Sequence, residues 1–310
     1  MERESRLERR RWPRVLSAYV RDNRPAAVGF GLAVFVLLFL ILQSINKVVS
    51  ANVPPGVENA LLGGCAGFAT TTLGALPALI LRKISQRLED SLLGFAAGMM
   101  LAASAFSLIL PGLEAGTEML GRKDLGALVV VFGMAIGVLL MLGLDRFTPH
   151  SHETTGPCGP GADRCSRVWL FVLAVALHNL PEGMAIGVSF AQNDFSVGIP
   201  LTTAIALQDI PEGLAVALAL RTAGLRIGQA VFGASLSGLL EPLGALLGVG
   251  LSSGLALTYP IGLGLAAGAM IFVVSHEVIP ETHRNGHQTA ATLGLMGGFA
   301  LMMVLDTTLG

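Results

Sequence analysis

Residues 168–191 read VWLFVLAVALHNLPEGMAIGVSFA, and residues 197–220 read VGIPLTTAIALQDIPEGLAVALAL. Each stretch is mainly apolar and exceeds the roughly 20 residues that a helix needs to span the hydrocarbon core of a membrane. Seven further apolar stretches of similar length lie at residues 26–44, 58–82, 91–112, 125–145, 227–251, 257–281 and 288–308. The sequence therefore predicts an all-α fold, a polytopic membrane helix bundle with nine spans.

The composition and the distribution of positive charge agree with this prediction. Hydrophobic residues make up 53% of the 310 residues, charged residues make up 13%, and the mean hydropathy is +0.68, which excludes an ordinary water-soluble surface. Cytoplasmic loops hold an excess of Lys and Arg. If the N-terminus is cytoplasmic, only Lys47, Arg122 and Lys123 fall on the opposite side. We therefore expect a protein of the bacterial inner membrane with a periplasmic C-terminus.

The chain divides into a basic cytoplasmic segment at 1–25, an extra N-terminal transmembrane helix at 26–44, and an eight-helix domain at 58–310 with a cytoplasmic loop at 147–167. An alternative interpretation of the first span is a cleaved signal sequence, because a basic start and an apolar stretch precede the small residues Val49-Ser50-Ala51. Both interpretations leave the other eight spans in the same orientation.

A polar motif is repeated in the middle of two neighbouring spans. The residues HNLPEG at 178–183 recur as QDIPEG at 208–213. A charged side chain at the bilayer centre costs about 2.5–3.5 kcal/mol on insertion scales, and such residues usually mark a functional site. We therefore expect these acidic groups to share a counter-charge.

Helical spacing indicates how these side chains could hold a cation. His178 and Asn179 lie four and three residues before Glu182, on one helix face, and the second copy places Gln208, Asp209 and Glu212 in the same way. Imidazole, carboxylate and amide groups offer nitrogen and oxygen ligands that suit Zn²⁺, Fe²⁺, Mn²⁺ or Cd²⁺.

Two further features fit an ion path. Pro181 and Pro211 lack an N–H and should free a backbone carbonyl in mid-span, which is tolerated where the backbone lines a cavity. Glu241, followed by Pro242, pairs another acid with a proline in the middle of its span. Glu182, Asp209, Glu212 and Glu241 together would carry four negative charges, which matches two divalent cations.

With these two motif copies, the chain resembles a prokaryotic member of the Zrt/Irt-like (ZIP) family of divalent metal transporters. The family's fourth-helix signature H-N-x-x-E-G matches residues 178–183. Its fifth-helix counterpart, commonly H-x-x-P-E-G, matches residues 208–213, with Gln208 where many members have His. The eight spans from about residue 58 match the family's eight-helix core, and the first span is an addition.

The resemblance implies uptake of Zn²⁺ into the cytoplasm through a binuclear site, by alternating access, with Cd²⁺, Fe²⁺ and Mn²⁺ as further substrates. It implies that one metal position uses His178, Glu182, Gln208 and Glu212, with a thioether from Met100. The other position would use Asn179, Asp209 and Glu241, with the carboxylates of Glu182 and Glu212 shared. His276 and Glu277 look like the family's seventh-helix motif, and we interpret them as an exit relay.

These expectations imply a transporter and not an enzyme. The ions are cargo, no catalytic cofactor is expected, and the partners are divalent metal ions and the lipid bilayer, with no nucleic acid; a homodimer is left open. One alternative is a proton-coupled carrier of another solute that uses the acids as relays. An intramembrane metallohydrolase is a further alternative, but the sequence lacks the His-Glu-x-x-His motif of many metalloproteases.

Overall fold

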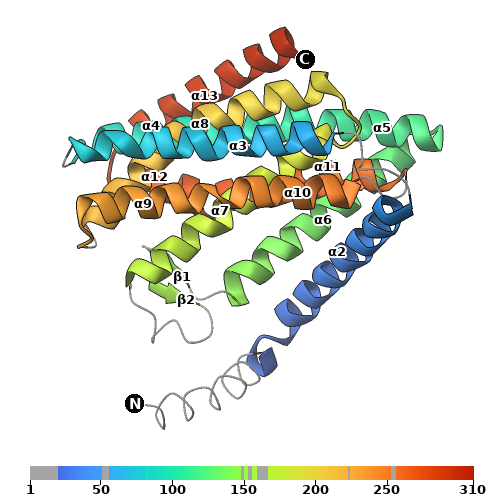
Figure 1. Ribbon diagram of the computed structural model, residues 1–310, viewed down its shortest axis with the longest axis horizontal. Helices are drawn as coiled ribbons and strands as arrows, with labels where there is room; N and C mark the ends of the chain where they lie inside the picture. Colours follow the sequence, from blue (N-terminus) through green and yellow to red (C-terminus); the bar gives the residue numbers. More distant parts are fainter. Residues whose placement is uncertain are drawn as a thin grey trace.

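The computed structural model describes residues 20–50, 56–81, 83–147, 150–152, 156–158, 167–222, 224–252 and 256–310. These residues form a bundle of long helices (Figure 1). In chain order the elements are α2 (Arg24–Ser50), α3 (Val57–Ala75), the 3₁₀ turn η1 (Leu76–Leu79), α4 (Gln86–Ala103), the π-helical turn η2 (Ser104–Ile109), α5 (Leu110–Leu120), α6 (Lys123–Phe147), β1 (His150–His152), β2 (Gly156–Cys158), α7 (Arg167–Phe190), α8 (Phe195–Thr222), α9 (Ile227–Gly238), α10 (Leu240–Ser252), α11 (Thr258–Val273), the π-helical turn η4 (Val274–Val278), α12 (Ile279–His283) and α13 (Gln288–Leu309).

The predicted fold class is confirmed. Seven helical runs in the described ranges are long and apolar enough to cross a membrane: Val57–Leu79, Gln86–Leu120, Lys123–Phe147, Phe195–Thr222, Ile227–Ser252, Thr258–His283 and Gln288–Leu309. The helices α2 and α7 occupy the two other predicted positions, with 27 and 24 residues. A multi-pass helical membrane protein is therefore established, and a crossing at all nine positions stays a prediction.

The predicted flanking segments are described only in part. Most of the basic segment 1–25 lies outside the described residues, and α2 begins at Arg24. Within the predicted loop 147–167, β1 and β2 form a short antiparallel ladder in which Ser151 pairs with Pro157. These two three-residue strands depart from a purely helical chain without changing the bundle.

One helical run is longer than predicted. The sequence predicts a span at 91–112, whereas α4, η2 and α5 run together from Gln86 to Leu120. The run starts early because the Ser85 side chain accepts the Leu88 N–H and so satisfies a free donor of the first turn. It continues through Pro111 after the π-helical turn η2, and it ends at Gly121, whose φ of 65° is left-handed.

A second irregularity lies beside a predicted site residue. The run Ile227–Ser252 is interrupted at Leu239, between α9 and α10. Pro242 has no N–H to donate to the carbonyl of Gly238, which is the last residue of α9. The interruption therefore falls one turn before Pro242, and Glu241 lies in the first turn of α10.

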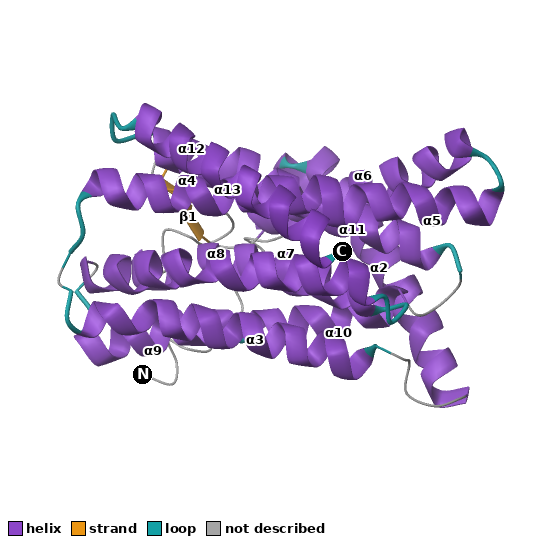
Figure 2. Cartoon of the chain, turned by 90° about the horizontal axis from the view of Figure 1, so that it is seen from above, coloured by secondary structure: helices purple, strands orange, loops and turns teal. Residues whose placement is uncertain are grey.

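Close helix packing sets the arrangement around the motif helices. Seen from above, α3, α9 and α10 lie along one side of the bundle and α4, α12 and α13 along the other, with α7 and α8 between them (Figure 2). Gly183 of α7 faces the backbone of Glu241, and Gly244 of α10 faces the backbone of Leu180. A methyl group at either glycine would overlap the other helix, so α7 and α10 touch at the level of the polar motif.

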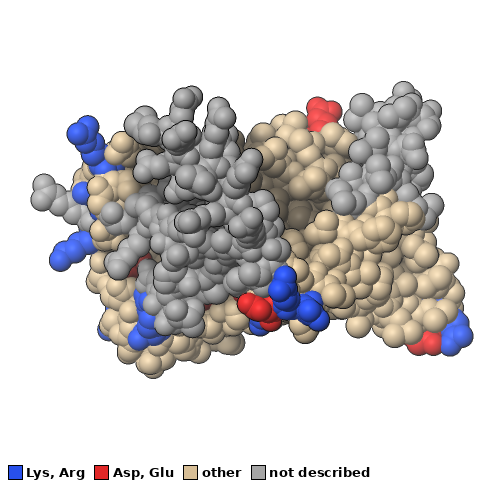
Figure 3. All heavy atoms as spheres, turned by 90° about the horizontal axis from the view of Figure 1, so that it is seen from below, with Lys and Arg blue, Asp and Glu red and all other residues tan. Residues whose placement is uncertain are grey.

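The outer surface is suited to lipid. Large apolar side chains are exposed on α2, α6 and α13, and they include Phe35, Leu128, Phe132 and Leu293. In Figure 3, Lys and Arg atoms lie at the two ends and along the lower edge of the visible face, and broad areas between them carry no charged side chain. Such contiguous apolar surface is rare on soluble monomers and agrees with a position in the bilayer.

Candidate metal centre

The two copies of the polar motif meet inside the bundle. Glu182 of α7 and both Asp209 and Glu212 of α8 each offer a carboxylate oxygen, and these three oxygens all lie within 4.8 Å of one another. Glu182 is fully buried, Asp209 is 2% exposed, and Glu212 is half-buried. Helices α7 and α8 continue unbroken through Pro181 and Pro211, so the motif residues keep their helical spacing.

Within the described residues, few hydrogen-bond donors reach the oxygens of this cluster. Gln208, also fully buried, donates its Nε2 to Glu182 Oε1 at 2.7 Å. Among the described residues, no hydrogen-bond partner reaches five buried oxygens: Asn179 Oδ1, Glu182 Oε2, Gln208 Oε1, Glu212 Oε1 and Glu241 Oε2. Buried polar atoms normally have partners, and buried charges are paired or bind metals. Acceptor oxygens with no donor are therefore the feature that a bound cation would satisfy.

A third helix places Glu241 beside Asp209, next to the group of three carboxylates but outside it. The side chain of Glu241 is fully buried, and its Oε1 accepts the Thr71 hydroxyl of α3 at 2.9 Å. A Cβ built at Gly67 would overlap Glu241 Oε2 and would lie 3.2 Å from Asp209 Oδ2, so both of these oxygens lie beside α3 at Gly67. None of the site residues expected from the sequence lies in α3. The only sequence signal for this contact is the run Thr70-Thr71-Thr72 inside an apolar span.

His178 of α7 contacts an acid on another helix. Its Nε2 lies 2.8 Å from Glu277 Oε2, in the π-helical turn η4. From the resemblance, His178 is expected in the first metal position and Glu277 in an exit relay, and the structure shows these two side chains in contact. The π-helical turn changes which residues of its helix face α7, and π-bulges are frequent at functional sites.

The remaining exit residue points elsewhere. His276 Nε2 lies 4.0 Å from Asp145 Oδ2 of α6, and the His276 ring stacks on Phe272 with 4.9 Å between the ring centroids. The side chain of His276 is 49% exposed and that of Asp145 is 8% exposed. His276 and Glu277 are neighbours in sequence that contact different helices, α6 and α7.

Met100 lies near the C-terminal end of α4, and it is 2% exposed. It belongs to the apolar core that includes Ile186 of α7 and Ile205 of α8. A thioether ligand from Met100 stays a prediction, and so do all the metal-ligand roles.

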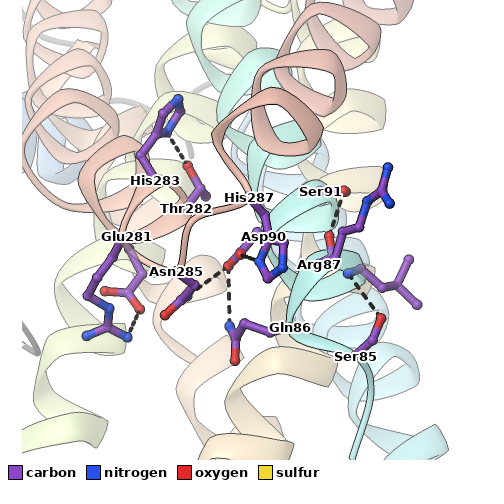
Figure 4. Close-up of polar contacts among 12 residues, drawn as sticks. Ser85, Gln86, Arg87, Asp90, Ser91, Glu281, Thr282, His283, Asn285 and His287 are labelled. Atoms are coloured by element: carbon purple, nitrogen blue, oxygen red, sulfur yellow. Dashed lines mark hydrogen bonds and ion pairs between the residues drawn. The ribbon is translucent and has the colours of Figure 1, made fainter.

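Another buried acid lies outside the centre, near the start of α4. Asp90 is 1% exposed, and its carboxylate contacts three side chains (Figure 4). Gln86 Nε2 and Asn285 Nδ2 donate to Oδ1 at 3.3 and 3.0 Å, and His287 Nδ1 lies 2.9 Å from Oδ2. Both Asn285 and His287 belong to the connection between α12 and α13, so Asp90 ties this connection to α4.

The fold and the buried acids define a multi-pass membrane protein with an acidic centre suited to divalent cations. A model of the ZIP zinc transporter family matches residues 159–306. Similar proteins are zinc transporter ZIPB of Bordetella bronchiseptica, 67% identical over 275 residues (89% of this chain and 89% of ZIPB), and zinc transporter GufA of Myxococcus xanthus, 42% identical over 255 residues (82% and 99%). Zinc transporter ZupT of Corynebacterium glutamicum is 36% identical over 251 residues (77% and 94%). The chain belongs to the ZIP family of zinc transporters. The resemblance inferred from the two motif copies is therefore confirmed.

Proposed function

We propose that this protein carries Zn²⁺ across the bacterial inner membrane into the cytoplasm, and that Cd²⁺, Fe²⁺ and Mn²⁺ are further substrates. One observation carries the proposal: three carboxylates from α7 and α8 each place one oxygen within 4.8 Å of the others, and some of their buried oxygens have no donor within the described part of the chain. Three relatives are named as zinc transporters, which supports Zn²⁺ as the cargo. A transporter of this kind needs no catalytic activity.

The centre would hold two ions. One position would use His178, Glu182, Gln208 and Glu212, and the other Asn179, Asp209 and Glu241, with Glu182 and Glu212 shared between them. Gln208 donates its Nε2 to Glu182 Oε1, so its Oε1 is the atom that it would offer to the cation. An amide is a weaker ligand than an imidazole, so Gln208 in place of His favours a broad range of ions.

Release toward the cytoplasm would begin at the contact between His178 and Glu277. This contact is 2.8 Å long and joins α7 to η4, so His178 could leave the ion and contact the Glu277 carboxylate as the ion departs. His276 would take the ion further toward the cytoplasm, because its side chain is 49% exposed and lies 4.0 Å from the Asp145 carboxylate. We place the N-terminus in the cytoplasm and the C-terminus in the periplasm, as the Lys and Arg distribution predicts.

Alternating access would move α7, α8, α9 and α10 against the other helices. The α7 and α10 backbones touch through Gly183 and Gly244, which supports their movement as one unit. Disulfide crosslinks that trap this unit against α4 or α6 should stop transport, and full transport in the crosslinked protein would contradict the mechanism.

Zinc flux into proteoliposomes tests the function. Wild-type protein should take up Zn²⁺, and the double variant Glu182→Ala with Glu212→Ala should lose uptake entirely, because it removes both shared carboxylates. The matched control is Glu114→Ala with Glu118→Ala, which removes two exposed carboxylates of α5 and should retain full uptake. Unchanged uptake in the first variant would refute the site. Proton flux without any zinc flux in the wild type would instead favour a proton-coupled carrier of another solute.

A further inference from the structure

The helix α3 supplies no ionisable group to the centre, yet it contacts two of the four acids. The Thr71 hydroxyl is 2.9 Å from Glu241 Oε1, and the Thr70 hydroxyl is 3.3 Å from Asp209 Oδ2. Thr71 is 2% exposed, so water does not compete for this contact. Both acids belong to the same metal position in the proposed function, and α3 therefore lies against one position of the two.

The contact with Thr71 fixes which oxygen of Glu241 is available. Oε1 accepts the hydroxyl, whereas Oε2 has no donor among the described residues and lies beside Gly67. The absence of a side chain at Gly67 makes the room for Oε2, because a methyl group there would overlap it. Thr71 and Gly67 lie one helical turn apart and together orient the Glu241 carboxylate. Thr71 holds Oε1, and Gly67 leaves room for Oε2.

The hydroxyl also has a second acceptor. Thr71 Oγ1 lies 3.1 Å from the Gly67 carbonyl oxygen, which is the usual back-bonding partner of a Thr in a helix. A hydroxyl carries one proton, so it donates to only one acceptor at a time. When Glu241 turns toward an ion, Thr71 can donate to Gly67 O instead, and no buried donor is left unpaired.

We propose that Thr71 is a positioning residue for the metal centre, which holds Glu241 so that Oε2 faces the ion, and that Gly67 provides the space for it. The inference rests on the proposed function, since it assigns a role toward the same ions. Groups that hold a metal ligand in place typically change metal affinity by about 10–100-fold when they are removed. Thr71 does this from a helix that contributes no ligand.

Cd²⁺ titration of the purified protein by calorimetry tests the proposal. Thr71→Val keeps the shape and removes the hydroxyl, so Cd²⁺ affinity at one position should fall about tenfold, and Thr71→Ser should restore it. Thr117→Val is the matched control, because the Thr117 hydroxyl on α5 donates to the Leu113 carbonyl and, within the described residues, makes no hydrogen bond to an acid, so the variant should bind as the wild type does. Should Thr71→Val fail to fold, Thr71→Ala removes the same hydroxyl with less bulk.

A second variant acts through space instead of through the hydroxyl. Gly67→Ala should displace Glu241 Oε2 and weaken the same Cd²⁺ position, whereas Gly297→Ala on α13 meets nothing within 4 Å and should have no effect. In a Glu241→Gln background, Thr71→Val should add no further loss, because its effect passes through Glu241.

The outcomes separate this inference from the proposed function. Cd²⁺ affinity equal to the wild type in Thr71→Val, or an additive loss in the Glu241→Gln background, would overturn the positioning role while leaving the transporter proposal intact. A wild-type protein that binds neither Cd²⁺ nor Zn²⁺ would overturn both. Weakened binding in Thr71→Val and Gly67→Ala, with rescue by Thr71→Ser, would establish the role.

Discussion

Asp90 and Glu182 are both carboxylates in the interior of the bundle, but their surroundings are opposite. Three side chains surround Asp90, from α4 and from the connection between α12 and α13. Glu182 has one amide donor on Oε1, no partner on Oε2 among the described residues, and two further carboxylates nearby. A buried acid with a full set of donors holds the fold together, whereas a group of acids without donors is ready for a cation.

The largest expected effect is stabilisation of the folded protein by a bound metal ion. At a free Cd²⁺ concentration of 1,000 times Kd, a single site adds about 4.1 kcal/mol to the free energy of unfolding. The thermal unfolding of the detergent-solubilised wild type should therefore shift strongly upward with Cd²⁺, and the shift should be lost in Glu182→Gln with Glu212→Gln. Asp90→Asn is the control and should keep the shift. A shift that depended on Asp90 and not on the two glutamates would reverse the comparison.

A smaller effect is expected from Asp90→Asn in the absence of metal. The amide NH₂ replaces one acceptor oxygen, so one of the surrounding donors loses its partner, and the cost is about 1–3 kcal/mol of unfolding free energy. Thermal unfolding without metal measures this loss. In Glu212→Gln the same change should instead maintain or raise stability, because it relieves repulsion between neighbouring carboxylates. A stability loss in Glu212→Gln as large as that in Asp90→Asn would remove the distinction between the two kinds of acid.

The smallest effect on stability is expected at the exit. The side chain of His276 is 49% exposed and lies 4.0 Å from Asp145, so His276→Gln should change the free energy of unfolding by less than about 0.5 kcal/mol. Its zinc uptake rate should nevertheless fall, since His276 would relay the ion outward. Uptake kinetics in proteoliposomes measure this rate, and an unchanged rate would exclude His276 from the path.

Sequence reasoning located the helices well because each span is read from its own residues. The predicted span 168–191 corresponds to α7 at Arg167–Phe190, and 197–220 corresponds to α8 at Phe195–Thr222. It underestimated the run from Gln86 to Leu120, because the polar first turn and Pro111 resemble helix ends. A capping serine and a π-helical turn extend this run, and neither leaves a clear periodic signal.

The acids of the centre could be predicted because a charged residue inside an apolar span is easily seen in the sequence. Glu182, Asp209 and Glu212 stand out for this reason, and the structure brings them together. Thr71 and Gly67 are neutral and common in membrane helices, so nothing in the sequence separates them from packing residues. Asp90 lies at the polar edge of a span, where an acid is unremarkable in sequence.

The sequence by itself determined the membrane helix bundle, the family and the acids at its centre, because hydrophobic period and buried charge are properties of single segments. Only the tertiary structure decided that His178 meets Glu277, that α3 orients Glu241, and that Asp90 secures the connection to α13. The physical reason is that helical spacing states which residues share a face, whereas the contacts of that face depend on how separate helices cross. Those crossings depend on glycine contacts and π-helical turns that arise when the whole bundle packs.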